Sequence, residues 1–310
     1  MTQGVVFGSP IRIFPATVIY SMNRDLLQRF VFEDFPVRGA VVHLNAAWEA
    51  ILERHDYPEP IRKLLGELLA ASALLASTIK YQGSLSLQVQ GDGPITLMVA
   101  EYTHEHTLRG IAHWQGDCVG SFRQLLGAGK FVITVDQSEY GHRYQSIVPL
   151  AGDTVAQMLQ NYLVQSEQLD TYLWLGSDAT CAAGMLLQKM PGDAGTDEDA
   201  WDRVTQLTRT LTSLELFTLG NMDLLYRLFH EENLRLFESQ PVSFRCKCTR
   251  ERVRNMLRSL GADEIDDIVA KEGAVTVNCE FCNQRYDFDR VDLDQLFAAE
   301  VSPDVPRTRH

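Results

Sequence analysis

The pattern of apolar and polar residues predicts short strands separated by helices over the first 190 residues. Residues 84–90 and 95–100 alternate in polarity around the turn Gly91-Asp-Gly-Pro94, which indicates a β-hairpin. Because most of the strands come in such pairs, with helices between the pairs, the pattern favours an α+β fold over a doubly wound sheet. Four further strands are expected, at residues 131–136, 144–148, 171–176 and 181–188.

Apolar runs mark the expected helices of the same region. The longest run, residues 64–79, is shorter than the roughly 20 residues of a membrane span, and it contains Glu67, so we expect a buried helix. Pro58 and Pro60 precede it, where a first helical turn tolerates proline. Other helices are expected at residues 25–32, 44–55 and 153–166.

The amino-acid composition of the chain changes after Pro191. Residues 192–199 are small and acidic, which indicates a domain boundary. Beyond them, apolar residues at helical spacing predict helices at about 198–212 and 222–229, and a third helical segment at 234–237. These helices are too few to make a core of their own, so they must dock on a neighbour.

The chain is therefore expected to have three parts and a tail. We predict an α+β core domain at residues 1–191, a metastable helical linker at 192–240, a small C-terminal zinc-binding domain at 241–299 and a loose tail at 300–310. In the C-terminal domain, helices are expected to begin at Thr249 and near Asp263 and to end at Gly261 and near Gly273.

Four cysteines in the C-terminal domain could bind a metal ion or form disulfides. Cys246 and Cys248 form a CxC pair, and Cys279 and Cys282 form a CxxC pair, the usual zinc knuckle. In a strand, residues i and i+2 share a face about 6.6 Å apart, so the CxC pair can chelate one ion. That distance is also near the limit of about 6.8 Å for a disulfide. The spacing thus permits two states, a reduced zinc site or a pair of local disulfides.

Basic residues surround the CxC pair, and positive charge favours the thiolate that binds metal and reacts with oxidants. They are Arg245, Lys247, Arg250, Arg252, Arg254 and Arg258, against the single acid Glu251. The same residues could be a solvated helix face or a nucleic-acid patch, although a net charge of −13 argues weakly against the patch. Constitutive nucleic-acid binding through a zinc ribbon is therefore kept as the alternative function.

Catalytic signatures are missing from the sequence. No ATPase, kinase or dinucleotide motif appears, so we expect neither an energy-consuming enzyme nor a catalytic residue. A thiol-disulfide oxidoreductase using Cys279 and Cys282 would lack its βαβ context. Cys118 and Cys181 are expected to be buried. With no secretory signal at the N-terminus and cysteines in metal spacing, we expect a reducing cytoplasm and no membrane association.

The cysteine motifs and their flanks resemble the 33 kDa chaperonin family, the redox-regulated heat-shock holdases. The resemblance rests on Phe244-x-Cys-x-Cys248, Thr249-Arg-Glu-Arg-Val253 and Cys279-Glu-Phe-Cys282, and it continues in Tyr57-Pro58, Gln90-Gly-Asp-Gly-Pro94 and Ser166-Glu-Gln168. One departure is Asp170, where many members have proline.

The resemblance implies a redox switch. Family members bind one zinc ion through the four cysteines when reduced and inactive. Oxidation pairs the sulfurs that correspond to Cys246 with Cys248 and Cys279 with Cys282, and it releases the zinc. The zinc domain and linker then unfold. The activated protein, typically a homodimer, holds unfolding client proteins without ATP.

Overall fold

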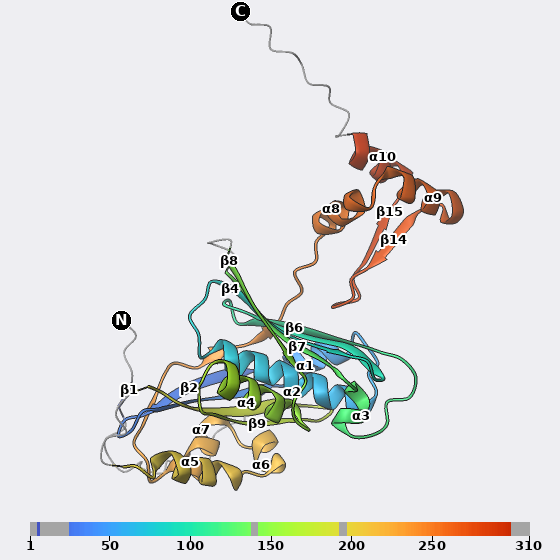
Figure 1. Ribbon diagram of the computed structural model, residues 1–310. Coiled ribbons are helices and arrows are strands. Elements are labelled where there is room, and N and C mark those ends of the chain that lie inside the picture. The colour runs from blue at the N-terminus through green and yellow to red at the C-terminus, as the bar shows by residue number, and fades with distance from the viewer. Residues whose placement is uncertain (1–4, 7–24, 138–141, 192–196, 299–310) are drawn as a thin grey trace, which may run out of the picture. The chain divides into compact units, whose positions relative to one another are not determined.

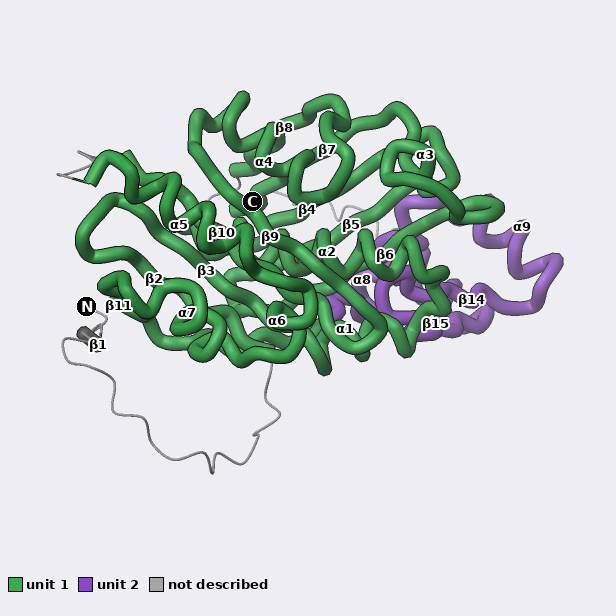
Figure 2. Tube along the Cα trace, turned by 90° about the horizontal axis from the view of Figure 1, so that it is seen from below, with its two compact units in different colours: residues 1–245 green, residues 246–310 purple. Residues whose placement is uncertain are grey.

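The computed structural model describes residues 5–6, 25–137, 142–191 and 197–298 of the 310-residue chain. The chain forms two compact units, residues 1–245 and 246–310 (Figure 2). Residues 197–245 thus belong to the same unit as the α+β region that precedes them. Among the described residues, no helix has the length and apolarity to cross a bilayer.

The first unit contains two sheets, here called sheet A and sheet B. Sheet A has the order β1-β11-β2-β3-β10-β9, with β12 also paired to β2, and all its pairs are antiparallel. Its strands are β1 (Val5–Val6), β2 (Leu26–Phe32), β3 (Val37–Leu44), β9 (Thr171–Ser177), β10 (Ala182–Lys189), β11 (Leu234–Leu236) and β12 (Gln240–Pro241).

Sheet B has the order β13-β6-β5-β4-β7-β8, and it is antiparallel except for the parallel pair of β13 and β6. The predicted hairpin at 84–100 is present in it, and the predicted strands at 131–136 and 144–148 pair with each other. Its strands are β4 (Gly83–Gly91), β5 (Ile95–Thr103), β6 (Thr107–Trp114), β7 (Gly129–Gln137), β8 (His142–Pro149) and β13 (Ser243–Phe244).

Helix α2 (Glu59–Ala76) is the centre of the first unit and lies between the two sheets (Figure 1). Every residue from Leu64 to Ala76 is buried, because the helix is apolar on all sides, as expected of a core helix. Burial raises the pKa of Glu67 in this helix to about 7, against a small opposing effect of Lys63. The remaining helices before Pro191 are α1 (Ala46–Leu52), α3 (Phe122–Leu126) and α4 (Val155–Ser166).

Three linker helices cover the outer face of sheet A (Figure 1): α5 (Ala200–Arg209), α6 (Ser213–Thr218) and α7 (Asn221–Phe229). Side chains alternate along each strand, so one face of sheet A meets α2 and the other meets these helices. In β10, for example, Leu186 packs in the α2 cluster, whereas Met185 and Leu187 pack in the linker cluster. Sheet A is therefore apolar on both faces.

The described part of the second unit, residues 246–298, is a small domain of three helices and a hairpin. Its elements are α8 (Arg250–Leu260), α9 (Ala262–Glu272), β14 (Val275–Asn278), β15 (Arg285–Phe288) and α10 (Arg290–Ala298). The Thr249 side chain accepts from the backbone N–H of Arg252, which confirms the predicted cap, and glycines end α8 and α9 at the predicted positions. Its apolar core is Val253, Leu257, Ile265, Val275, Phe288, Leu293 and Leu296.

Two predicted helices are wrong. Residues 25–32 form strand β2, whose Leu27 faces α2 while Phe30 and Phe32 face the linker helices. The third helical segment of the linker is strand β11, paired with β2. In both cases strand pairing within sheet A outweighs a local apolar spacing that also suits a helix. The predicted tail at 300–310 lies outside the described residues.

Candidate metal centre

The four cysteines of the second unit come together from two places in its sequence. Cys246 and Cys248 lie in the extended segment before α8, and Cys279 and Cys282 lie in the turn between β14 and β15. All four Sγ atoms lie within 4.8 Å of one another. Elsewhere in the described ranges, no other group of three or more histidine, cysteine or acidic residues gathers in this way.

The distances between the sulfurs are those of a metal cage. The Sγ atoms of Cys246 and Cys279 are 3.6 Å apart, and those of Cys248 and Cys282 are 3.3 Å apart. A tetrahedral zinc ion with bonds of about 2.3 Å sets its sulfurs about 3.8 Å from one another, whereas a disulfide needs about 2.05 Å. All four are free thiols. The donor set and its geometry therefore fit zinc, which when bound crosslinks the two pairs.

Backbone hydrogen bonds shape the knuckle around the CxxC pair. The N–H of Cys279 donates to the carbonyl of Gln284 at 2.9 Å, and the N–H of Asn283 donates to the carbonyl of Cys279 at 2.8 Å. Asn283 has a φ of +59°, a left-handed conformation that asparagine tolerates, and this reverses the chain just after Cys282. The turn thus directs both sulfurs to one side.

The thiols differ in acidity because they share hydrogen bonds. Burial acts to raise the pKa of Cys246, but hydrogen bonds from the backbone N–H of Cys248 and from the neighbouring thiols outweigh it and bring the pKa to about 7. Burial raises the pKa of Cys282 and of Cys279. The Tyr286 hydroxyl donates to the Sγ of Cys248 at 3.2 Å, and that bond raises the pKa of Tyr286 to about 12. Tyr286 thereby supports one ligand from outside the cage.

Several of the basic residues near the CxC pair have partners inside the protein. The Arg250 guanidinium lies 4.3 Å from the centre of the Phe288 ring and pairs with Asp292 at 2.7 Å. Arg252 donates to the carbonyl of Lys247 at 2.9 Å, which fixes the residue between the two cysteines. Part of the basic cluster therefore holds the second unit together, a role that sequence patterns did not indicate.

The two remaining cysteines and a group of three histidines belong to the first unit and not to the unit that holds the cage. Cys118 and Cys181 are buried in the first unit, as predicted. His104 and His106 lie at the turn between β5 and β6, and His113 lies within β6. None of these three histidines joins a metal-binding group among the residues that the structure describes.

His43 is a residue that sequence reasoning missed. It lies in β3, is 3% exposed and hydrogen-bonds two linker helices. Its Nε2 donates to the carbonyl of Leu216 in α6 at 2.5 Å, and its Nδ1 is 2.6 Å from the side-chain amide oxygen of Asn221 in α7. A lone polar residue in the apolar run from Ala40 to Leu44 was the available signal. His43 fixes the position of the linker on sheet A.

A family model described as Hsp33 protein matches residues 25–289, most of the chain. The chain belongs to the Hsp33 family. A 33 kDa chaperonin of Nitrosococcus oceani is 47% identical to it over 289 residues, covering 93% of this chain and 99% of that protein. A 33 kDa chaperonin of Methylobacillus flagellatus is 48% identical over 289 residues, covering 92% of this chain and 99% of that protein.

A solved structure agrees with this assignment. The crystal structure of the 33 kDa chaperonin of Thermotoga maritima, a heat shock protein 33 homologue, superposes with a TM-score of 0.79 at 25% identity, covering 90% of this chain and all of the other. The predicted α+β fold with a small C-terminal cysteine domain is confirmed. Hsp33 membership makes this chain a heat-shock chaperone, and its cysteine cluster fits redox regulation. The alternative of a constitutive nucleic-acid-binding ribbon gains no support from these matches.

Proposed function

We propose that this chain is an ATP-independent holdase whose activity is switched on when oxidation removes zinc from Cys246, Cys248, Cys279 and Cys282. The observation that supports it most is the cage itself, four thiols within 4.8 Å in a unit with a small apolar core. In the reduced protein one zinc ion per chain holds the second unit folded. The protein then keeps its client-binding surface covered.

The second unit needs zinc to stay folded, because its apolar core contributes less free energy than the metal site. A core of this size contributes at most about 3–5 kcal/mol to folding, whereas a structural zinc site contributes about 10–16 kcal/mol. Within residues 246–298, seven buried apolar side chains are shared among three helices and a hairpin. Loss of the metal therefore unfolds the unit.

Oxidation supplies the trigger. Hydrogen peroxide takes two electrons from each pair of zinc-bound thiolates, and the two sulfurs of the pair form one S–S bond. The peroxide takes up two protons from the solvent and becomes two water molecules. The proposed bonds are Cys246–Cys248 and Cys279–Cys282, which remove all four zinc ligands. Both bonds close very short loops, so they restore little of the lost stability. Peptide mapping by mass spectrometry distinguishes this pairing from Cys246–Cys279 with Cys248–Cys282, the cross pairs that are 3.6 and 3.3 Å apart when reduced.

A short strap connects the linker to the first cysteine. Strand β12 pairs with β2, Val242 is buried in the first unit, and β13 pairs with β6. The backbone N–H of Arg245 then donates to the carbonyl of Leu108 at 3.0 Å, one residue before Cys246. Unfolding of the second unit therefore leaves this strap with a disordered chain on its C-terminal side, which favours its detachment.

Detachment of the linker creates the client-binding surface. The linker helices cover Phe30, Phe32, Val41, Met185 and Leu187 on the outer face of sheet A. Undocking exposes these side chains together with the apolar sides of α5–α7, and a large exposed apolar patch binds other apolar surfaces. The same patch accounts for binding of unfolding clients and for a homodimer of the active form. No catalytic step and no nucleotide is involved, and the cytoplasm supplies the reducing state that keeps zinc bound.

The experiment compares suppression of client aggregation by reduced and peroxide-treated protein at mild heat, without nucleotide, while a chromogenic chelator reports zinc. We expect release of one zinc per chain and suppression only after oxidation. The Cys118→Ala variant is the matched control and should behave like the parent. Equal suppression in both redox states would contradict the switch but keep the chaperone, and zinc retention in an active oxidised protein would contradict the mechanism.

A further inference from the structure

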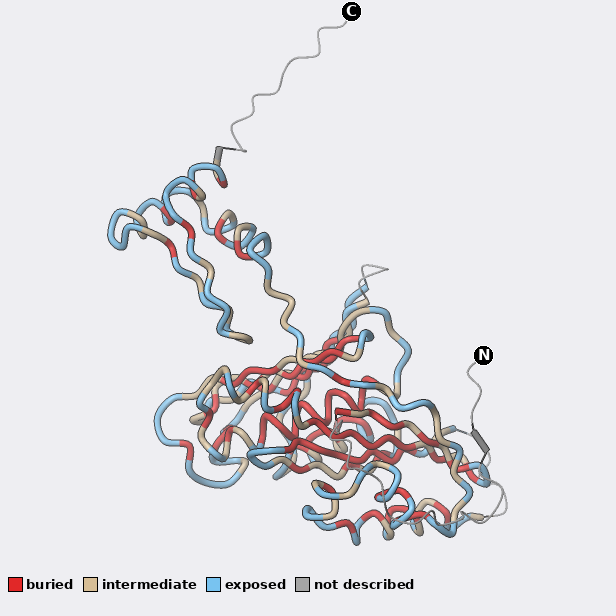
Figure 3. Tube along the Cα trace, turned by 180° about the vertical axis from the view of Figure 1, so that it is seen from behind, coloured by how far each residue is buried: buried red, intermediate tan, exposed pale blue. Residues whose placement is uncertain are grey.

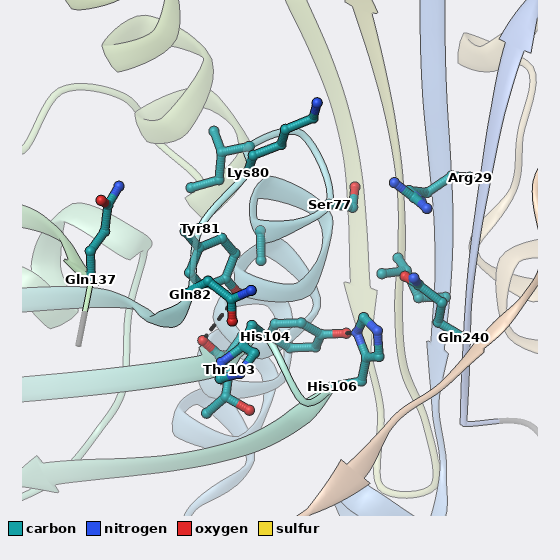
Figure 4. Close-up of a pocket in the computed structure, with 14 residues that line it drawn as sticks. Arg29, Ser77, Lys80, Tyr81, Gln82, Thr103, His104, His106, Gln137 and Gln240 are labelled. Carbon is teal, nitrogen blue, oxygen red and sulfur yellow. Dashed lines mark hydrogen bonds between the residues drawn. The ribbon is translucent and has the colours of Figure 1, made fainter. Parts of the chain in front are cut away.

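A hollow of about 460 Å³ lies in the first unit, far along the chain from the cysteines (Figure 4). It opens where the C-terminal end of α2 meets strands of both sheets. Its polar lining includes Arg29 from β2, Ser77 and Lys80 after α2, His106 from the turn between β5 and β6, and Gln240 from β12. Apolar walls come from Leu27, Ala76 and Ile79. The volume is in the range of small-molecule sites.

The lining is cationic, and none of the fourteen residues around the hollow is acidic. Arg29 and Lys80 form no ion pair with any carboxylate in the described ranges. The Nε of Arg29 is buried without a hydrogen-bond partner, and the guanidinium lies 5.4 Å from the centre of the Phe237 ring. Burying a charged donor without a partner costs free energy, so the hollow favours a ligand that supplies acceptors.

The nearby carboxylate and helix-end carbonyls already have other partners. The carboxylate of Glu101 lies near enough to help raise the pKa of Tyr81, but it forms an ion pair with Arg109 at 2.8 Å. At the end of α2, the hydroxyls of Ser77 and Thr78 donate to the carbonyls of Leu74 and Leu75, so these carbonyls are satisfied without a cation. Burial lowers the pKa of His106, and the positive charge of Arg29 adds to this effect.

Figure 4 shows the guanidinium of Arg29 directed toward Ser77, with the amide of Gln240 beside it. The ring of His106 is hydrogen-bonded to the Tyr102 hydroxyl at 3.0 Å. Arginine presents a planar fork of N–H groups that matches phosphoryl oxygens two at a time. We propose that this hollow binds a small phosphoryl oxyanion, either inorganic phosphate or a phosphomonoester, through Arg29 and Lys80.

The site also touches the linker, which gives the ligand a regulatory consequence. Gln240 lines the hollow and Phe237 lies against Arg29, and both belong to the segment at 192–240. A ligand held between core and linker residues binds the docked state more tightly than the undocked state, so it stabilises docking. The anion should therefore slow oxidative activation. This second step rests on the proposed function, whereas binding itself does not.

The binding test is calorimetric titration of reduced, zinc-loaded, full-length protein at constant ionic strength. The probes are inorganic phosphate, glycerol 3-phosphate and, as a neutral control, glycerol. We expect one saturable site for a phosphoryl probe and none for glycerol. Arg29→Gln should weaken binding at least about tenfold, because it removes a charge-assisted pair, and Lys80→Gln should weaken it several-fold.

Arg123→Gln is the matched control, since Arg123 is an exposed arginine paired with exposed Asp153. It should bind as the parent does. Lys80 is exposed, so its variant folds even where Arg29→Gln does not. Absence of saturable binding, or equal binding by the parent and Lys80→Gln, overturns the site.

A second measurement tests the coupling. The rate of activation by peroxide is followed with and without saturating phosphoryl probe, and a several-fold slower rate is expected for the parent but not for Lys80→Gln. If the probe binds but the rate of activation does not change, the coupling is wrong and the binding site still stands. Binding without any oxidative activation overturns the proposed function instead, so the two failures are distinguishable.

Discussion

The two units of this chain are stabilised in different ways. In the first unit, buried residues are concentrated in α2 and in the central strands of the two sheets, whereas in the second unit they are few and separated by exposed residues (Figure 3). Apolar burial holds α2 and the strands packed against it at any redox state. We propose that the second unit depends on zinc bound by four thiols, which an oxidant can convert to disulfides. A redox signal can therefore unfold one part of the chain while the other keeps its fold.

Zinc removal should give the largest difference between the units. A chelator added under reducing conditions should cost the second unit about 10 kcal/mol or more and unfold it, while the first unit keeps its sheets. Site-resolved NMR of β14–β15 against β4–β7 measures this. Native chemical shifts for the β14–β15 hairpin in metal-free protein would contradict a metal-dependent fold.

Glu67→Gln should change only the first unit. The pKa of Glu67 is about 7 in the folded protein, well above the ordinary value of about 4.3. Between these values the folded state binds more protons than the unfolded state, so stability falls as pH rises. Glutamine has no charge to bury, so it avoids this fall in stability. It should raise the free energy of unfolding above pH 7 by up to about 3 kcal/mol.

Chemical denaturation of the first unit at pH 5 and pH 8 measures the effect of Glu67→Gln. The gain should be much smaller at pH 5. Glu49→Gln, at an exposed position in α1, is the control and should change nothing. An equal gain at both pH values would show that charge burial is not its cause.

His43→Leu should loosen the linker without disturbing the zinc. Leucine keeps most of the buried volume but removes the hydrogen bonds of His43 to the Leu216 carbonyl and to the side-chain oxygen of Asn221, at a cost to docking of about 2 kcal/mol. Limited proteolysis of α5–α7 in the reduced protein should accelerate, and activation should need less oxidant. His113→Leu, in sheet B, serves as the control. Unchanged cleavage would remove His43 from the docking mechanism.

Tyr286→Phe should have the smallest effect, confined to the second unit. It deletes the hydroxyl that donates to Cys248 and should weaken zinc binding about tenfold, the lower end of the range for such supporting groups. Competition with a zinc chelator of known affinity measures it. Tyr226→Phe, on the exposed side of α7, is the control. A zinc affinity equal to the parent's would show that the hydroxyl plays no part.

The sequence predicts the four-cysteine cluster better than the contacts that dock the linker helices on sheet A. Local spacing is enough to identify Cys246, Cys248, Cys279 and Cys282, because zinc knuckles are short-range features. Strand β2 is different, since its apolar spacing suits a helix and only pairing with β3 and β11 makes it a strand. His43 and Arg29 gain their roles from residues more than 170 positions away, such as Leu216 and Phe237. Sheet register sets such contacts, and local patterns do not encode it.

The most direct test of the account is hydrogen exchange across the chain before and after oxidation by peroxide at mild heat. We predict that residues 246–298 lose protection as zinc leaves, that α5–α7 lose it together with them, and that β4–β7 remain protected. Full protection of α5–α7 in zinc-free, oxidised protein would contradict the claim that the second unit controls the docking of these helices on sheet A.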